Sequence, residues 1–83
     1  MYSIQNQKRD VIYYRPNVKK FYVNETNRDN KTTFEIRASI DENDRLLGVY
    51  SKKETAQKIM LEMICDNFWT NAPVYCMPED ETL

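Results

Sequence analysis

The chain has 83 residues, with 12 Lys and Arg against 13 Asp and Glu, so its formal net charge is −1 and it has room for one small domain. It contains no histidine, one glycine and two cysteines. These counts exclude Ser-His-Asp and Cys-His catalytic groups, histidine metal sites and glycine-rich phosphate loops. Composition therefore predicts a small binding domain that is not an enzyme and that holds no metal or cofactor.

The first part of the chain consists of short extended runs separated by polar turns. Tyr2–Gln5 and Asp10–Tyr14 are candidate strands, and Pro16 ends the second. An extended pattern resumes over Asn17–Val23. The wholly polar segment Asn24–Lys31 follows, and we predict that it is the widest loop.

The segment Thr33–Ile40 alternates apolar and polar side chains and is the clearest strand. Its apolar face consists of Phe34, Ile36, Ala38 and Ile40. A polar turn over Asp41–Asp44 leads into Arg45–Tyr50, which we expect to be its antiparallel partner. Gly48 within that partner suggests a β-bulge or the close approach of another backbone.

Apolar residues three or four positions apart then predict an amphipathic helix over about residues 52–67, with one face on the sheet. These residues are Ala56, Ile59, Met60, Met63, Ile64 and Phe68. Ser51 and Glu54 have the spacing of a capping box at its start.

After Pro73, the segment Val74–Met77 is predicted to be a short edge strand. The order of elements predicts a single α+β domain over residues 1–79, an antiparallel β-meander of about four to six short strands packed by one amphipathic helix. Residues 80–83 form an acidic tail. A core this small barely offsets the cost of ordering the chain, so we also expect a homo-oligomer.

The N-terminal residues lack the apolar segment of a signal peptide, and no apolar run approaches the roughly 20 residues that cross a bilayer. We therefore expect a cytoplasmic protein without a membrane partner. Cys65 and Cys76 could form one disulfide, but extracellular domains of this size usually carry several. Free thiols buried in the core are favoured.

Charge is unevenly distributed along the chain. Residues 1–40 contain eight Lys and Arg against four acids, which leaves 12 − 8 = 4 against 13 − 4 = 9 for residues 41–83. Lys19 and Arg37 could give the sheet a basic, tyrosine-lined outer face suited to phosphates and stacked bases. An ordinary solvated face is favoured over this interpretation, because the net charge supplies no long-range attraction to a polyanion.

Trp69 lies one position off the apolar stripe of the predicted helix, close in sequence to Tyr75. An exposed tryptophan beside a tyrosine is typical of an interface anchor. The final strand could equally fold over Trp69 and bury it, so both interpretations stay open.

Several short motifs resemble those of small, largely uncharacterised proteins from phages and mobile elements of low-GC Gram-positive bacteria. They are Leu47–Ser51, Glu54, Ala56, Ile59–Ile64 and the closing Tyr75–Glu79, which match an L-G-x-Y strand end, an E-x-A-x-x-I helix and a Y-x-M-P-E terminus. The resemblance implies a strand-rich sheet with one helix and a mobile-element context. It supplies no catalytic residues.

Together these observations lead us to expect a non-enzymatic, phage- or mobile-element-encoded binding protein that inhibits a bacterial host defence system. It would dock on a protein effector, or sequester a nucleotide signal between subunits through arginine and tyrosine side chains. The alternatives are a nucleic-acid-binding regulatory module that uses the basic sheet face and, less favoured, a minor enzyme or enzyme accessory. The residues expected to carry binding are Arg15, Lys19, Arg37, Trp69 and Tyr75.

Overall fold

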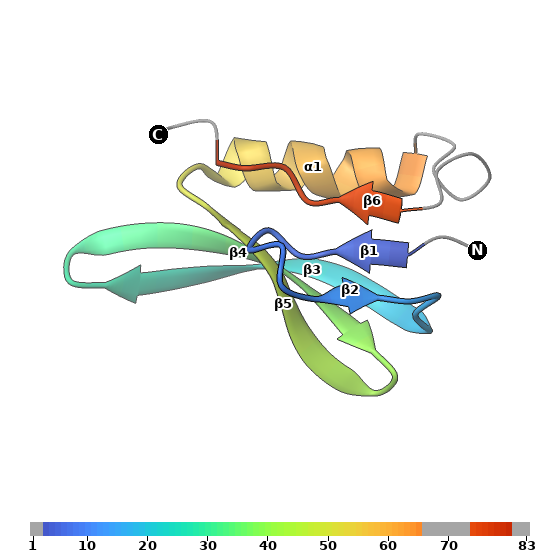
Figure 1. Cartoon of the computed structure of the whole chain (residues 1–83). Coiled ribbons are helices and arrows are strands. Elements are labelled where there is room, and N and C mark those ends of the chain that lie inside the picture. The colour runs from blue at the N-terminus through green and yellow to red at the C-terminus, as the bar shows by residue number, and fades with distance from the viewer. Residues whose placement is uncertain (1–2, 66–73, 81–83) are drawn as a thin grey trace.

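The computed structural model describes residues 3–65 and 74–80. The elements in chain order are β1 (Ser3–Gln5), β2 (Ile12–Tyr13), β3 (Val18–Arg28), β4 (Lys31–Ile40), β5 (Asn43–Tyr50), α1 (Lys53–Cys65) and β6 (Val74–Cys76). They form two three-stranded sheets, β3-β4-β5 and β2-β1-β6, together with the single helix (Figure 1). The predicted α+β fold, a β-meander with one packed helix, is confirmed.

Strand β4 is the centre of the larger sheet and pairs antiparallel with β3 and β5. The predicted apolar face is the one that packs into the core, because Ile36, Ala38 and Ile40 are all buried there. Helix α1 covers this face. Its residues Ala56 and Met63 are completely buried, as the helical spacing predicts.

The helix lies within the predicted range of about 52–67, of which residues 66 and 67 fall outside the described part of the chain. In its first turn the Ala56 amide donates a hydrogen bond to the Lys52 carbonyl at 3.2 Å. The Ser51 amide and hydroxyl both donate to the Asp80 carboxylate, at 3.2 and 3.3 Å. In the described ranges no helix is long and apolar enough to cross a membrane.

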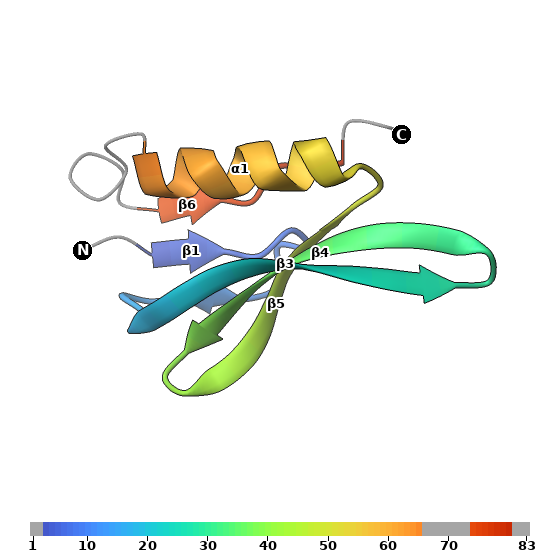
Figure 2. The same ribbon diagram turned by 180° about the vertical axis from the view of Figure 1, so that it is seen from behind.

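The prediction of a wide loop over residues 24–31 is wrong. Strand β3 continues to Arg28 and β4 begins at Lys31, so only Asp29 and Asn30 make the turn. These two residues have φ of 50° and 62°, the left-handed conformation that a two-residue hairpin turn requires and that Asp and Asn tolerate. The polar strand residues therefore pair through their backbones. They form an arm that projects beyond the helix (Figures 1 and 2).

The second hairpin is also tighter than predicted, with only Asp41 and Glu42 between β4 and β5 and φ of 50° and 68°.

Strand β5 contains a bulge. Ile36 pairs with Gly48 but Arg37 pairs with Leu46, so one extra residue, Leu47, bulges from β5. A β-carbon on Gly48 would lie 2.9 Å from the Tyr50 ring. The β-bulge expected near Gly48 is confirmed, and the group that approaches Gly48 closely is a side chain rather than another backbone.

The smaller sheet joins the two ends of the described chain. Strand β1 lies in its centre, antiparallel to β2 and parallel to β6, with Ser3 opposite Val74. The edge strand predicted over residues 74–77 is confirmed as β6. Ile4 and Met77 are completely buried and belong to the same core as the larger sheet.

The prediction that both cysteines are buried is wrong for Cys76, whose thiol is free and exposed. Successive residues of a strand point to opposite faces, and in β6 the core-facing position is taken by Tyr75. Cys76 therefore faces solvent. The side chain of Cys65 lies outside the described residues.

Candidate functional site

The outer face of the smaller sheet carries exposed apolar side chains on both sides of its polar central strand, β1. Gln5 pairs with both Ile12 and Cys76, so these three side chains form one row across the sheet. Tyr14 follows Ile12 on the same face, and Val74 precedes Cys76 on it. We call Ile12, Tyr14, Val74 and Cys76 the apolar sheet face.

The exposed fractions of its side chains are large: 76% for Tyr14, 54% for Ile12 and 39% for Val74. Antiparallel sheets usually bury one face and present polar side chains on the other. Here the inner face is already filled, because Ile4, Tyr13 and Tyr75 all pack into the core. The apolar residues of the outer face therefore lie outside the core.

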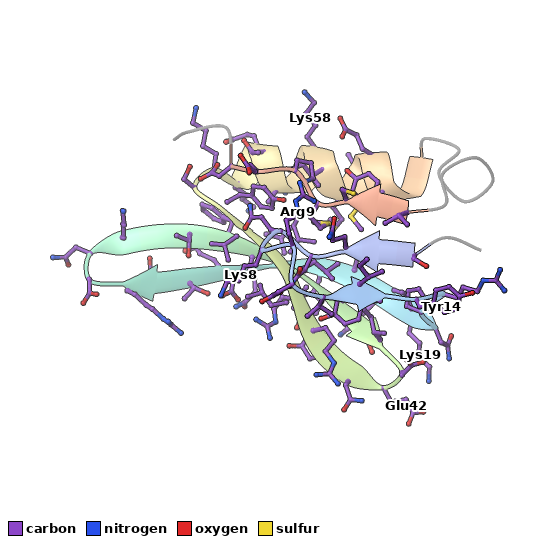
Figure 3. The ribbon with its side chains drawn as sticks, in the orientation of Figure 1. Lys8, Arg9, Tyr14, Lys19, Glu42 and Lys58 are labelled. Atoms are coloured by element: carbon purple, nitrogen blue, oxygen red, sulfur yellow. The ribbon has the colours of Figure 1, made fainter. Side chains whose placement is uncertain are left out.

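Two arginines flank the apolar sheet face. The Arg15 guanidinium lies 5.4 Å from the centre of the Tyr14 ring, a cation–π contact. In the β1–β2 turn, Nη1 of Arg9 lies 3.5 Å from Oε1 of Gln5 (Figure 3). Both arginines have positive φ, 64° for Arg9 and 43° for Arg15, so each end of β2 turns sharply away from the strand.

Gln7 fixes the β1–β2 turn to the larger sheet. Its backbone amide donates to the Leu47 carbonyl at 2.8 Å. Its side-chain Oε1 accepts from the Val49 amide at 2.8 Å, and Nε2 donates to the carbonyls of Val49 and Pro78 at 3.0 and 3.3 Å. The apolar sheet face is therefore carried by a braced scaffold, which lowers the entropic cost of binding.

The outer face of the larger sheet has a different character. The Arg37 guanidinium lies 2.7 Å from Asp44 and 3.0 Å from Glu35, and the Tyr22 hydroxyl donates to Asp44. These hydrogen bonds, from Tyr22 first and then from Arg37, lower the pKa of Asp44. The Lys20 ammonium lies 5.1 Å from the Tyr22 ring centre. This face is a network of opposite charges and not the basic face considered from the sequence.

The predicted binding residues are dispersed. Arg15 borders the apolar sheet face, Arg37 belongs to the charge network, and Lys19 lies 3.4 Å from Glu42 at the β4–β5 turn. Tyr75 faces the core. Trp69 lies outside the described residues.

Sequence reasoning missed Ile12, Tyr14 and Val74. The run of four apolar or aromatic residues Val11–Tyr14 could have indicated Ile12 and Tyr14. Successive side chains of a strand point to opposite faces, so an edge strand that is apolar at every position exposes apolar side chains on one of them.

Residues 3–65 and 74–80 contain no group of three or more acidic or cysteine side chains placed to hold a metal ion. Comparison of the chain with protein-family models, curated proteins and solved structures gives no significant match. The surface chemistry described above is therefore the structural basis for assigning a function.

Proposed function

We propose that the chain is a non-enzymatic binding protein that docks on a second protein through the apolar sheet face. The observation that carries the proposal is the exposure of Ile12 and Tyr14 at one edge of a braced sheet and of Val74 at its other edge, all on the same face. Tyrosine and arginine are the residue types enriched at the energetic centres of protein interfaces, and here Arg15 lies over Tyr14.

The flanking charges indicate the chemistry of the partner. Arg9 and Arg15 flank this face. Asp10 of the β1–β2 turn accepts a hydrogen bond from the Asn6 side chain at 2.7 Å. A partner with an apolar patch rimmed by Asp or Glu would complement both the exposed apolar area and the surrounding positive charge. We therefore assign the face to an acidic-rimmed protein surface.

Within this proposal, the partner is an effector of a bacterial host defence system, and the chain is a phage- or mobile-element-encoded inhibitor. This part rests on the resemblance to small mobile-element proteins. Inhibition by occupying a surface needs no catalytic group, which agrees with a chain that lacks histidine.

The test is plaque formation on host strains that each carry one defence system, with the chain expressed in the host. We expect the chain to restore plaques on a susceptible strain, and the double variant Ile12→Ser, Tyr14→Ser to lose this activity while keeping its circular dichroism and Tm. The matched control is Leu61→Ser, which replaces an apolar side chain that is 57% exposed on α1.

Photo-crosslinking identifies the partner directly. A benzophenone amino acid in place of Tyr14 should capture the effector, and the same group in place of Leu61 should not. Two results would overturn the proposal: full activity of the double variant, or a homodimer in sedimentation that the double variant dissociates, since the face would then serve a second copy of this chain.

Nucleic-acid binding through the larger sheet is less well supported, because Arg37 is already paired with two carboxylates. Retardation of DNA or RNA that weakens steeply with salt would favour it over protein docking.

A further inference from the structure

A groove of about 370 Å³ lies where the N-terminal half of α1 meets the projecting arm of β3 and β4. Its volume is within the range of small-molecule sites. It is on a different surface from the apolar sheet face, and no residue lines both. The groove is formed because the arm continues past the helix, so core-facing positions of the arm are left partly uncovered.

The floor of the groove is apolar and aromatic. Phe21 and Val23 of β3, Phe34 of β4 and Met60 of α1 line it, and all four are only half-buried. Phe34 pairs with Glu25, and Phe21 lies further along the ladder opposite Ala38, so the two rings line different ends of the groove. A half-buried phenylalanine ring on a sheet surface is one on which a planar aromatic ring can stack.

The rim carries three polar side chains of different chemistry: Glu25 from the arm and Lys53 and Gln57 from the helix. In the described ranges none of the three makes a side-chain hydrogen bond or an ion pair. Their donors and acceptors are therefore available to a ligand. Lys53 provides positive charge, and Glu25 provides a carboxylate that accepts hydrogen bonds.

We propose that this groove binds a nucleoside monophosphate with a guanine base. The base would stack on Phe34, which lies opposite Glu25 in the β3–β4 pairing, and Lys53 would pair with the phosphate. Guanine has two adjacent donors on one edge, its ring N–H and its exocyclic amino group, and these match the two oxygens of a carboxylate such as that of Glu25. Adenine lacks this pair of adjacent donors, so the carboxylate selects guanine.

Isothermal titration calorimetry with guanosine monophosphate tests the proposal, with adenosine monophosphate, guanosine and inorganic phosphate as comparison ligands. We expect guanosine monophosphate to bind at least ten-fold more tightly than each of the other three. Chemical shifts of the Phe34 ring protons should move on binding, because a stacked base imposes a ring current on them.

Two lysines of the same helix provide a matched pair of variants. Lys53→Gln should weaken binding at least ten-fold, and Lys58→Gln should leave it unchanged, because Lys58 points away from both sheets (Figure 3). Glu25→Gln should reduce the preference for guanine over adenine. Circular dichroism checks that each variant remains folded.

Three results would overturn the proposal: no binding at millimolar guanosine monophosphate, equal losses for the two lysine variants, or inorganic phosphate competing as well as the nucleotide. The double variant Ile12→Ser, Tyr14→Ser should bind the nucleotide normally. Failure of the groove is therefore distinguishable from failure of the protein-docking proposal.

Discussion

The side chain of Gln7 is hydrogen-bonded to both backbone groups of Val49, accepting from its amide at 2.8 Å and donating to its carbonyl at 3.0 Å. A single side-chain amide thus extends the ladder of the larger sheet beyond β5. The same Nε2 also reaches the carbonyl of Pro78. Gln7 consequently links three segments that are far apart in the sequence.

Replacing Gln7 by methionine, which has a similar shape, should destabilise the protein by roughly 2 kcal/mol, because it removes several hydrogen bonds and leaves the Val49 amide unpaired. Urea denaturation measures the change. The exposed helix residue Gln57 is the control, and Gln57→Met should change stability by less than about 0.5 kcal/mol. Equal effects at the two sites would contradict the bridging role.

The substitution Gly48→Ala should cost about 1–3 kcal/mol, the usual range for overpacking. The added β-carbon would meet the Tyr50 ring at 2.9 Å. That ring cannot move aside easily, because it is completely buried and its hydroxyl donates to the Pro78 carbonyl at 2.6 Å. In a Tyr50→Leu background, Gly48→Ala should reduce the free energy of unfolding by less than half as much. If the effects of the two substitutions were additive in this double-mutant cycle, a clash between the added β-carbon and the Tyr50 ring would be excluded.

The hydrogen bonds to Asp44 make one contribution to stability depend on pH. Its pKa is lowered in the folded protein, so the stabilisation is present above the unfolded pKa of about 3.9 and is lost as the pH falls through the lower folded pKa. Asp44→Asn should therefore lower Tm at pH 7 and have progressively less effect below pH 4. A Tm difference for Asp44→Asn that is constant with pH would exclude this linkage.

The stability of the arm should depend on whether the residue at position 30 tolerates a positive φ. Asn30 has φ of 62°, so Asn30→Gly should strengthen the arm, and Asn30→Val should weaken it by about 1–2 kcal/mol. Amide hydrogen exchange measures the effect locally, as roughly ten-fold lower protection of the arm in the valine variant. Amides near the turn between β4 and β5 should be unaffected; a loss spread evenly over both hairpins would mean that Asn30 acts on the whole fold.

Elements with a strong apolar period could be predicted from the sequence. The alternation over Thr33–Ile40 places β4, and the three- and four-residue spacing around Ile59 places α1. Gly48 correctly indicated an irregular strand, because a glycine leaves a gap in the row of side chains that a regular strand packs.

The arm could not be predicted in this way, because the strand residues Asn24–Arg28 have no apolar face and pair mainly through backbone groups and polar side chains. The short pair Asp29-Asn30 was the only local signal for a tight turn. The parallel pairing of Ser3 with Val74 was also inaccessible, because no local pattern specifies which strands pair across the length of a chain.

The candidate site was predicted only in part. Arg15 was selected for its charge, and its neighbour Tyr14 was treated as an ordinary strand residue. Which face of β2 is exposed depends on the packing of Tyr13 into the core, and this follows from the placement of the small sheet on the large one. The packing of one sheet on the other cannot be inferred from a single sequence.

The central position of β1 in the small sheet imposes an order on folding. Its partner β6 is separated from it by most of the sequence, as in the bond between Gln7 and Pro78, which are 71 positions apart. The two hairpins of the larger sheet need only local contacts and can form early. During synthesis on the ribosome, one edge of β1 therefore stays unpaired until residues 74–76 emerge. The nascent chain is most exposed to aggregation in this interval, because an unpaired strand edge can pair with another chain.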